Sequence, residues 1–485
     1  MAIDYDIVII GGGSGGLVVA SAAAQLKAKV ALVEKEQDRL GGDCLYYGCV
    51  PSKSLIHAGE VAHSVKTGDL VGVKTSEPHI EFARATGHVQ SVIKTIAVHD
   101  STERFESLGV EVIYGSGEFK DKDTFVVNGR ELKSRTFVIS TGSHPVAPPV
   151  PGLEEAGYLT NIEVFSLARR PESLVVVGAG PIGCELGQSF SRLGSNVTIL
   201  SSRDVIMPKE DPELAQVVQD RMINEGINIL SRSRLERVEV HNSKKIVYAG
   251  KHRIETDEIL VSAGRKPNVS SLNLEAAGVQ VGKQGIAVNE KLQTTNPKIY
   301  ACGDVIGGYQ FTHMAGYEAS VVITNILARP FSLFLPLKAF QATYSVVPWA
   351  TFTDPELARV GLTEEEARQQ HGDDIIVVTH KYADVDRALA EGAGYGFAKV
   401  ICTPKGQILG AHIVGKSAGE LIHEYVMAIT WGLDINKVSG MIHVYPTLSE
   451  INAKVALQVK KLSYAKNTGL QNFLKKYFDF RRAIA

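Results

Sequence analysis

One pattern occurs twice in this chain and constrains its fold more than any other feature. Each copy is an apolar strand, a turn of the form G-x-G-x-x-G, and a helix pattern. The first copy runs from Ile7 through Gly11–Gly16 and the second from Leu174 through Gly178–Gly183, so their first glycines are 167 positions apart. This distance indicates duplication of a whole βαβ unit rather than a short-period repeat.

Each copy is followed by the strands that a complete unit needs. Second strands are expected at 29–34 and 196–201, and later strands end in small-residue turns at 140–142 and 262–264. Glycines in such a turn let backbone N–H groups at a helix N-terminus approach a pyrophosphate. The sequence therefore predicts two α/β units that each bind a dinucleotide.

The residues at the end of the second strand suggest which nucleotide each unit binds. In the first unit this residue is Glu34, whose carboxylate can accept hydrogen bonds from the ribose hydroxyls of an adenosine. In the second unit Ser201, Ser202 and Arg203 occupy this region. An acidic residue would repel a 2′-phosphate, whereas these three can bind one. The second unit is therefore expected to favour NADPH over NADH.

Two cysteines lie five positions apart in the segment 41–53. On a regular helix such residues are about 7.5 Å apart along the axis, too far for a relaxed disulfide, whose Cα atoms lie within about 6.8 Å. Pairing Cys44 with Cys49 needs a distorted turn, for which Gly48 supplies the freedom. A pair placed there suits a reversible redox disulfide better than a structural one.

These motifs together resemble the class I flavoprotein disulfide reductases, the group of glutathione reductase, dihydrolipoyl dehydrogenase and mercuric reductase. The similarity extends from Tyr5 to about Ala456 and includes the start of a dimerisation domain at 347–356. It implies an α/β fold with two Rossmann-like domains, for FAD and NAD(P), and a C-terminal α+β dimerisation domain. The implied boundaries are 1–155 with 275–340 for FAD, 156–274 for NAD(P), 345–459 for dimerisation and 460–485 for a basic tail. The prolines at 145–151 and the stretch 328–348 are expected crossovers between these domains.

The resemblance also implies roles for individual residues. Cys49 would be the thiolate facing the flavin, Cys44 the thiol facing the substrate, and Lys53 would pair with Glu185 beside the flavin. Electrons would pass from the nicotinamide to FAD and then to the disulfide. The residues expected to bind FAD are Gly11, Gly13, Ser14, Gly16, Glu34, Lys35, Gly42, Asp43, Thr141, Gly142, Gly303, Asp304, Thr312 and His313. Those expected to bind NAD(P)H are Gly178, Gly180, Ile182, Gly183, Ser201, Ser202, Arg203 and Gly264.

The C-terminal motif departs from the disulfide-reductase pattern, which carries a His-Pro pair and a nearby Glu. The residue before Pro446 is Tyr445, followed by Glu450, and in a homodimer Tyr445 would reach the partner's cysteine site. Tyrosine, with a usual pKa of about 10, is a poor proton donor or acceptor for a leaving thiol near pH 7. Tyrosine at this position is similar to mercuric reductase, although the C-terminal cysteine pair of that enzyme is missing. His443 is a weaker candidate for a substitute base.

Three functions follow from these observations. The first is reduction of a thiophilic metal ion, held transiently as substrate by Cys44 and Cys49, or of a related acceptor such as a quinone; no structural metal is expected. The second is a disulfide reductase similar to dihydrolipoyl dehydrogenase. The third is a redox-sensing flavoprotein that signals to a membrane partner.

The charge of the chain is unevenly distributed. Residues 460–485 contain seven Lys or Arg and one acid, so they carry +6, whereas the whole chain carries −2. The balanced total disfavours nucleic acid as a partner. Apolar residues from Leu470 onward follow a helical period, which predicts an amphipathic basic helix. It would pack on its own dimer or dock on an anionic membrane surface. No targeting or membrane-spanning segment is visible, so a cytoplasmic enzyme, peripheral at the membrane in the second case, is expected.

Overall fold

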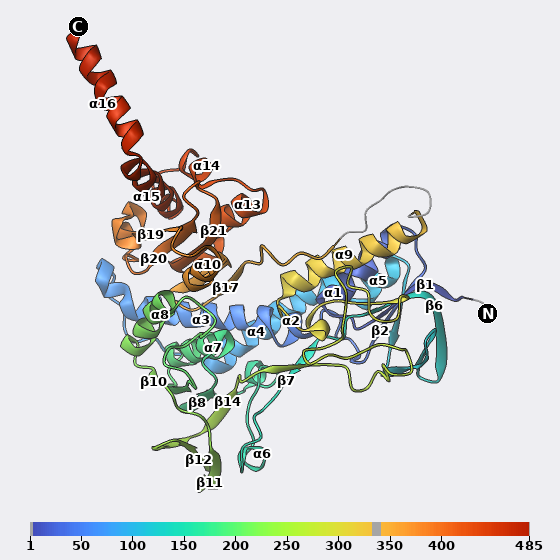
Figure 1. Cartoon of the computed structure of the whole chain (residues 1–485). Coiled ribbons are helices and arrows are strands. Elements are labelled where there is room, and N and C mark those ends of the chain that lie inside the picture. The colour runs from blue at the N-terminus through green and yellow to red at the C-terminus, as the bar shows by residue number, and fades with distance from the viewer. Residues whose placement is uncertain (1–2, 332–340, 485) are drawn as a thin grey trace.

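The computed structural model describes residues 3–331 and 341–484. The described part contains two sheets with parallel central strands, three antiparallel sheets of two, three and five strands, and a projecting C-terminal helix (Figure 1). Part of the expected crossover at 328–348, namely 332–340, lies outside the described residues, as do Met1, Ala2 and Ala485. None of the described helices is long and apolar enough to cross a bilayer.

The N-terminal sheet is built around the first glycine-loop unit. Its strands lie in the order β3-β2-β1-β6-β5-β4, with β16 beside β6. The strands are β1 (Tyr5–Ile10), β2 (Val30–Glu34), β3 (Val110–Tyr114), β4 (Gly117–Asp121), β5 (Thr124–Val127), β6 (Arg130–Ile139) and β16 (Ile299–Ala301). Helices α1 (Ser14–Gln25) and α9 (Thr312–Phe331) pack against Ile7 and Ile9, while Val8 and Ile10 face a second core. Both faces are buried, which explains the continuous apolar run of β1.

The second unit repeats this design. Four parallel strands lie in the order β10-β9-β8-β14, namely β8 (Ser173–Val177), β9 (Asn196–Leu200), β10 (Asn228–Leu230) and β14 (Glu258–Val261). Helices α7 (Pro181–Arg192) and α8 (Pro212–Asn224) cover one face. The other face packs on an antiparallel sheet of β11 (Arg237–His241), β12 (Lys244–Ala249) and β13 (His252–Thr256). The two predicted βαβ units are confirmed.

Two features join these parts. Strands β7 (Ser143–Pro145) and β15 (Arg265–Pro267) form an antiparallel ribbon where the chain enters and leaves the second unit. Helix α3 (Cys49–Thr67) packs on both α7 and α4 (Phe82–Ala97), and Figure 1 shows α3 and α4 running from the first unit to the second. Residues distant in sequence thereby meet along α3.

The C-terminal part has the predicted antiparallel sheet with helices. Its strand order is β17-β18-β21-β20-β19, the strands being β17 (Trp349–Thr351), β18 (Glu356–Gly361), β19 (Ile376–Lys381), β20 (Phe397–Cys402) and β21 (Ile408–Gly415). The helices that contribute to its core include α13 (His423–Thr430), α14 (Ile435–Ser439) and α15 (Glu450–Lys466). Helix α16 (Thr468–Ala483) follows. Because α15 runs through residue 460, the basic tail begins inside a helix of this part and not after it.

Shorter helices occupy the connections. They are α2 (Gly42–Tyr46), α5 (Thr102–Ser107), α6 (Leu153–Ala156), α10 (Glu364–His371), α11 (Asp386–Ala390) and α12 (Ala418–Leu421). Of these, α2 matters most for the site because it carries the first cysteine.

Candidate active site

The two cysteines lie on either side of a break between two helices. Cys44 is in α2, and Cys49 begins α3 after an interruption at 47–48. A Cβ atom on Gly48 would lie 3.0 Å from the carbonyl oxygen of Asp43 and 3.2 Å from the Cα of Cys44. Glycine is therefore what allows the close approach, and the predicted distorted turn is confirmed. Both side chains are free thiols, hydrogen-bonded to each other.

The two thiols differ sharply in acidity. Hydrogen bonding from Cys44 lowers the pKa of Cys49 to about 6, with help from the Thr312 hydroxyl and the charge of Lys53, although burial opposes the shift. The Sγ of Cys49 is 3.3 Å from the Oγ1 of Thr312, the first residue of α9. The same pairing with Cys49, together with burial, raises the pKa of Cys44. At neutral pH Cys49 is accordingly the thiolate and Cys44 the thiol.

The predicted pair of Lys53 and Glu185 is confirmed, although these residues are 132 positions apart. The Nζ of Lys53 lies 2.9 Å from the Oε2 of Glu185, whose side chain is buried. The Oε1 of the same carboxylate accepts the backbone N–H of Phe352 at 2.8 Å. The Lys53 ammonium also lies 4.3 Å from the centroid of the Phe352 ring. Phe352, which sequence reasoning did not assign to the site, thus contacts both partners of a charge pair in which Glu185 is buried and Lys53 is part-exposed.

The first glycine loop has the shape that a pyrophosphate requires. Gly11 has φ of +107°, and a Cβ there would lie 2.5 Å from the carbonyl oxygen of Ser140. A Cβ on Gly16 would lie 2.0 Å from the carbonyl oxygen of Gly11. Helix α1 begins at Ser14 after Gly13, and no side chain caps it. An uncapped helix N-terminus approached only by glycine backbone is suited to an anionic group.

The carboxylate at the end of β2 supports this loop. One oxygen of Glu34 accepts the backbone N–H of Gly12 at 2.7 Å and the other accepts that of Glu36 at 3.0 Å. These bonds hold the carboxylate beside the loop, where an adenosine ribose would be expected. Lys35 differs, because its side chain is largely exposed and pairs only loosely with Glu36, at 3.5 Å. The loop and Glu34 fit FAD, whereas Lys35 is a peripheral member of the predicted set.

Asp43, which precedes Cys44, is paired with a cation. Its Oδ2 lies 3.2 Å from the Nη2 of Arg265, and the Nε of Arg265 lies 3.7 Å from Asp304. Ser143 donates to the Oδ2 of Asp304 at 2.5 Å and accepts from the Nε of Arg265 at 2.8 Å. Burial raises the pKa of Asp304. Arg265 therefore offsets the charge of Asp43. Its position in the sequence, directly after the predicted turn at 262–264, did not indicate this role.

The other residues predicted to bind FAD line the same region of the fold. A Cβ on Gly42 would lie 2.8 Å from the Cα of Gly13, so the cysteine helix abuts the first loop. Thr141 donates to the carbonyl of Asn268 at 2.7 Å, and Gly142 and Gly303 have φ of +68° and +76°. The ring of His313 is 2.9 Å from the carbonyl oxygen of Pro348 and stacks on Phe311.

The second glycine loop reproduces the geometry of the first. Gly178 has φ of +115°, a Cβ there would lie 2.7 Å from the carbonyl oxygen of Ser262, and one on Gly183 would lie 2.0 Å from that of Gly178. Gly180 precedes α7, which no side chain caps, and Ile182 is 40% exposed beside it. Gly264, at the end of the later strand, has φ of +154°. This loop is likewise suited to a pyrophosphate.

The three residues after β9 have different surroundings. Ser201 is buried, and its hydroxyl accepts the backbone N–H of Arg203 at 3.2 Å and donates to its carbonyl at 3.1 Å. Ser201 therefore shapes the loop, while Ser202 and the Arg203 side chain are exposed. Asp204 is ion-paired with Arg232. The exposed guanidinium of Arg203 is the group in this loop that is suited to bind a 2′-phosphate.

Tyr445 lies between α14 and α15 in the C-terminal part, and Figure 1 shows these two helices away from α2, which carries Cys44. Tyr445 is 66% exposed, and its hydroxyl donates to the Oδ2 of Asp386 at 3.1 Å, which raises the pKa of Tyr445. Glu450 is the first residue of α15. His443 is buried, with its Nε2 3.1 Å from the Oε2 of Glu424. This buried pairing argues against His443 as a substitute base.

Tyr445 belongs to an apolar surface. Exposed apolar side chains occur in the segment around it and in or directly after α13, namely Met427, Trp431, Met441, Ile442, Val444 and Tyr445. Ile442 is 100% exposed and Trp431 is 75% exposed. Exposed apolar patches of this kind mark contact surfaces between subunits. Such a surface is expected of a dimer.

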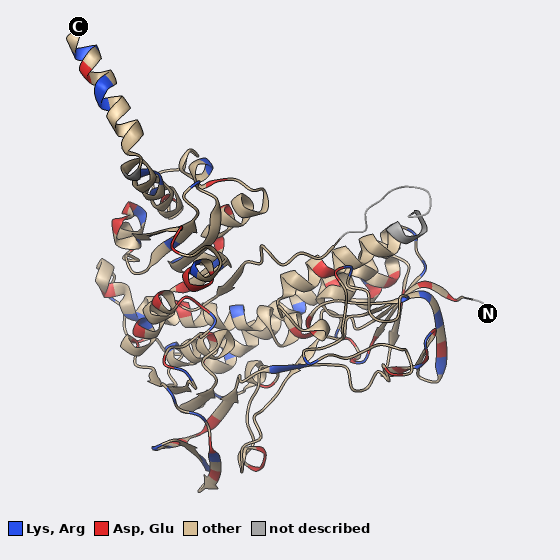
Figure 2. Cartoon of the chain, in the orientation of Figure 1, with Lys and Arg blue, Asp and Glu red and all other residues tan. Residues whose placement is uncertain are grey.

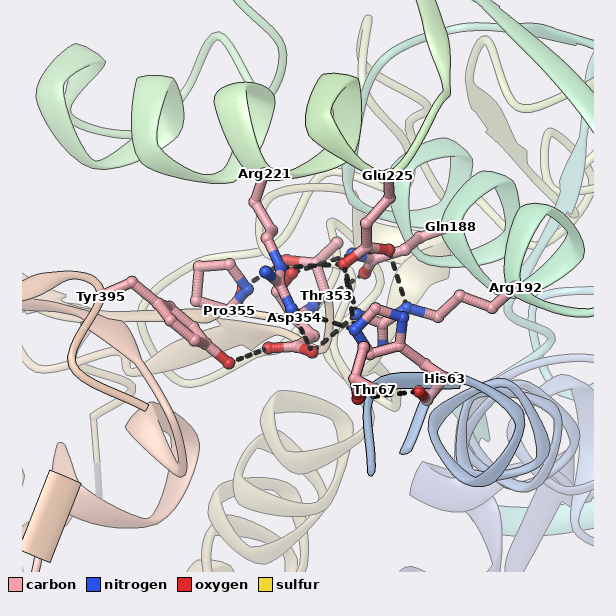
Figure 3. Close-up of polar contacts among 10 residues, drawn as sticks. All are labelled: His63, Thr67, Gln188, Arg192, Arg221, Glu225, Thr353, Asp354, Pro355 and Tyr395. Atoms are coloured by element: carbon pink, nitrogen blue, oxygen red, sulfur yellow. Dashed lines mark hydrogen bonds and ion pairs between the residues drawn. The ribbon is translucent and has the colours of Figure 1, made fainter. Parts of the chain in front are cut away.

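A charged cluster lies where α3, α7, α8 and the segment before β18 meet (Figure 3). The Arg192 guanidinium bonds the Glu225 carboxylate at 2.7 and 2.8 Å and that of Asp354 at 2.6 Å. His63 has one ring nitrogen 3.1 Å from Arg221. Potential metal-ligand atoms of His63, Glu225 and Asp354 lie within 4.8 Å of one another. Because guanidinium groups already satisfy both carboxylates, the cluster joins the three parts of the fold and does not suit a cation.

Comparison with known proteins agrees with this geometry. Residues 5–319 match the pyridine nucleotide-disulphide oxidoreductase family, and residues 347–456 match its dimerisation domain. The chain is 36% identical to a mercuric reductase of Bacillus cereus, over 92% of this chain and 70% of that protein. It is 32% identical to a dihydrolipoyl dehydrogenase of Bacillus subtilis (strain 168), over 92% and 96%.

A solved structure has the same fold. The HOCl-induced flavoprotein disulfide reductase RclA from Escherichia coli superposes with a TM-score of 0.83 at 29% identity, covering 93% of this chain and 99% of that chain. A Cu(II) complex of RclA matches with the same TM-score, covering 95% and 100%. The matched dimerisation domain and the apolar surface around Tyr445 support a homodimer. The chain belongs to the pyridine nucleotide-disulphide oxidoreductase family and is an NAD(P)H-dependent flavoenzyme with a redox-active disulfide centre.

Proposed function

We propose that this enzyme uses NADPH to reduce a thiophilic metal ion, Cu²⁺ or Hg²⁺, at Cys44 and Cys49. The observation that carries the proposal is Tyr445. Its hydrogen bond to Asp386 raises its pKa further above the neutral range, so it is poorly suited to exchange a proton with a leaving thiol. A thiolate-bound metal ion needs no such proton transfer.

The cysteine pair has the chemistry that such a substrate needs. The Cys49 thiolate, stabilised by Cys44, Thr312 and Lys53, is a soft ligand available at neutral pH. Cys44, a half-exposed thiol, is the second soft donor. The names of the mercuric reductase relatives and the Cu(II) complex of RclA support a thiophilic ion as substrate. A disulfide substrate, as in the dihydrolipoyl dehydrogenases, is the disfavoured alternative.

Residues of the two glycine loops and their surroundings would hold the cofactors. Bound FAD supplies the chemistry that takes two electrons from a reduced nicotinamide and delivers them to the cysteine site. Glu34 and the first loop would hold its adenosine and pyrophosphate, while Asp304 with Arg265 would lie along its ribityl chain. The α9 N-terminus at Thr312 offers a positive helix end to negative charge.

The overall reaction balances with one NADPH. Its hydride carries two electrons, which convert two Cu²⁺ to two Cu⁺, or one Hg²⁺ to Hg⁰, and yield NADP⁺ and one proton. In the proposed homodimer the partner subunit's Tyr445 would close the site over Cys44. Its aromatic ring would shield the metal-bound thiolates from water.

A panel of acceptors tests this proposal. NADPH oxidation is measured anaerobically with Cu²⁺, Hg²⁺, lipoamide, oxidised glutathione and a quinone. We expect turnover with a metal ion and slow turnover with both disulfides. Cys44→Ser should abolish the metal-dependent rate, whereas Cys402→Ala, at a buried cysteine of β20, should not. Fast lipoamide or glutathione turnover, on the order of 10 s⁻¹, would assign the enzyme to the disulfide reductases.

The preference for NADPH rests on Arg203. Its guanidinium is exposed at the end of β9, and none of the ion pairs of the described residues involves it. A hydrogen bond to a charged group contributes about 1.5–3 kcal/mol, so Arg203→Ala should lower kcat/KM for NADPH about tenfold or more. The value for NADH should stay close to that of the wild type. Equal losses with both nucleotides would contradict recognition of the 2′-phosphate. The control is Arg84→Ala, because Arg84 is an exposed arginine outside the second glycine-loop unit.

A further inference from the structure

The C-terminal helix α16 is unlike every other long helix described in this chain. None of its residues is buried, and Figure 1 shows it projecting from the body beyond α15. The side chain of Asn467 caps its start by accepting the backbone N–H of Leu470 at 3.0 Å. A capped sixteen-residue helix with no tertiary cover would be only marginally stable in water. We therefore expect a surface outside the described chain to cover α16 and stabilise it.

One side of α16 is apolar and largely aromatic. At 100° per residue its apolar residues occupy less than half of the helix circumference. They are Leu470, Phe473, Leu474, Tyr477, Phe478 and Phe480, with Ile484 immediately beyond. Phe473 is 64% exposed, Phe480 62% and Ile484 68%. The apolar side is thus open to its surroundings.

Most charges of α16 lie outside this apolar side: Lys475, Lys476 and Arg482 flank it and Asp479 lies opposite, whereas Arg481 falls within it near the end of the helix. Lys475, Lys476, Arg481 and Arg482 outnumber the single acid, Asp479, and Figure 2 shows both signs on the outer half of the helix. The arrangement of aromatic residues on one side and cations beside them is that of helices that lie in the plane of a membrane. A complementary surface carries negative charge above an apolar layer, as the headgroups and acyl chains of an anionic lipid bilayer do. Lys460 and Lys461, at the end of α15, extend the basic region.

We propose that α16 docks the enzyme on an anionic lipid surface. The apolar side would insert at the boundary of headgroups and acyl chains, and the lysines and arginines would contact lipid phosphates. The body of the enzyme would remain in the aqueous phase, since no described helix can span the bilayer. This inference is independent of the proposed acceptor.

The test is co-sedimentation of the full-length holoenzyme with vesicles. One set of vesicles contains phosphatidylcholine alone, and the other contains equal parts of phosphatidylcholine and phosphatidylglycerol. We expect binding to the anionic set, weakened by high salt. Removal of three cations in Lys475→Gln/Lys476→Gln/Arg482→Gln should weaken binding about 100-fold, since each basic residue near such a surface contributes roughly a factor of five. The matched control removes three exposed lysines elsewhere: Lys251, Lys283 and Lys405.

A second variant tests the apolar side without a change of charge. Phe473→Ser/Phe480→Ser should also lose vesicle binding, while keeping dimerisation and NADPH oxidation. Failure of the wild type to bind anionic vesicles would overturn the proposal. So would equal binding by the wild type and a chain that ends at Asn467. Dissociation of the dimer by the Phe473→Ser/Phe480→Ser variant would instead assign the apolar side to a second copy of the chain.

Discussion

The contact between Thr312 and Cys49 allows a quantitative test of how this protein makes its thiolate. Thr312→Val keeps the shape of the side chain but removes the hydroxyl that lies 3.3 Å from the Cys49 sulfur. A hydrogen bond to a charged group contributes about 1.5–3 kcal/mol, and 1.36 kcal/mol corresponds to one pKa unit. Because the Cys49 residue is exposed at the surface of the isolated chain although its thiol is partly shielded from water, the lower end of this range applies. We therefore expect the pKa of Cys49 to rise from about 6 to roughly 7.

The expected change is largest just below neutral pH. With a pKa of about 6, roughly half of Cys49 is thiolate at pH 6, and with a pKa of about 7 roughly a tenth is. The thiolate is lost as the pH falls through the pKa, so the variant should lose reactivity at a higher pH than the wild type. At pH 9 both proteins should be nearly fully ionised at Cys49 and react alike.

The assay is alkylation of the reduced holoenzyme by iodoacetamide across this pH range, with the Cys49 peptide quantified by mass spectrometry. The variant should react about five times more slowly at pH 6. Thr312→Ser, which retains the hydroxyl, is the matched control and should follow the wild-type profile. An unchanged midpoint in Thr312→Val would refute the role of this hydroxyl and would leave Cys44 and Lys53 as the cause of the low pKa.

Two further predictions concern the ion-pair cluster and the C-terminal motif. Arg192→Ala removes a buried guanidinium from Glu225 and Asp354, so unfolding should be easier by about 3–5 kcal/mol and Tm lower by about 3–5 °C in calorimetry. Arg84→Ala, in an exposed pair, should change Tm by less than about 1 °C. Equal effects would contradict the importance of the cluster. Tyr445→His supplies a group that titrates near pH 7 and should raise lipoamide turnover at least about tenfold, whereas Tyr445→Phe should not; no gain in the histidine variant would show that this position does not limit disulfide reduction.

The local elements of the site were predictable from the sequence because their signals are local. A glycine turn between an apolar strand and a helix, as at 11–16 and 178–183, depends on steric limits that act within a few residues. The same holds for the distorted turn at Gly48, which a five-residue cysteine spacing demands. These constraints do not require knowledge of distant segments.

Contacts between distant segments were not predictable in this way. Arg265 meets Asp43 from a strand 222 positions later, and Phe352 lies against Lys53 from the C-terminal part. Arg192, in the second glycine-loop unit, joins Glu225 of the same unit to Asp354 of the C-terminal part. No spacing in the sequence encodes these pairs, since each depends on how whole elements pack. The hydrogen bond between the Ser201 hydroxyl and the backbone of its own loop likewise depends on the burial of that side chain in the fold.

The sequence by itself determined the two nucleotide units, the redox cysteine pair and the amphipathic character of the tail, because periodicity and glycine stereochemistry act over short distances. The tertiary structure added the Thr312 hydroxyl to the surroundings of Cys49, because this contact forms only when α9 packs beside the start of α3, whereas Cys44 and Lys53 act on Cys49 from the same local segment. It also decided that His443 is engaged with Glu424 and that the apolar side of α16 has no cover in its own chain. Chemistry at this site therefore arises from charges that folding brings together.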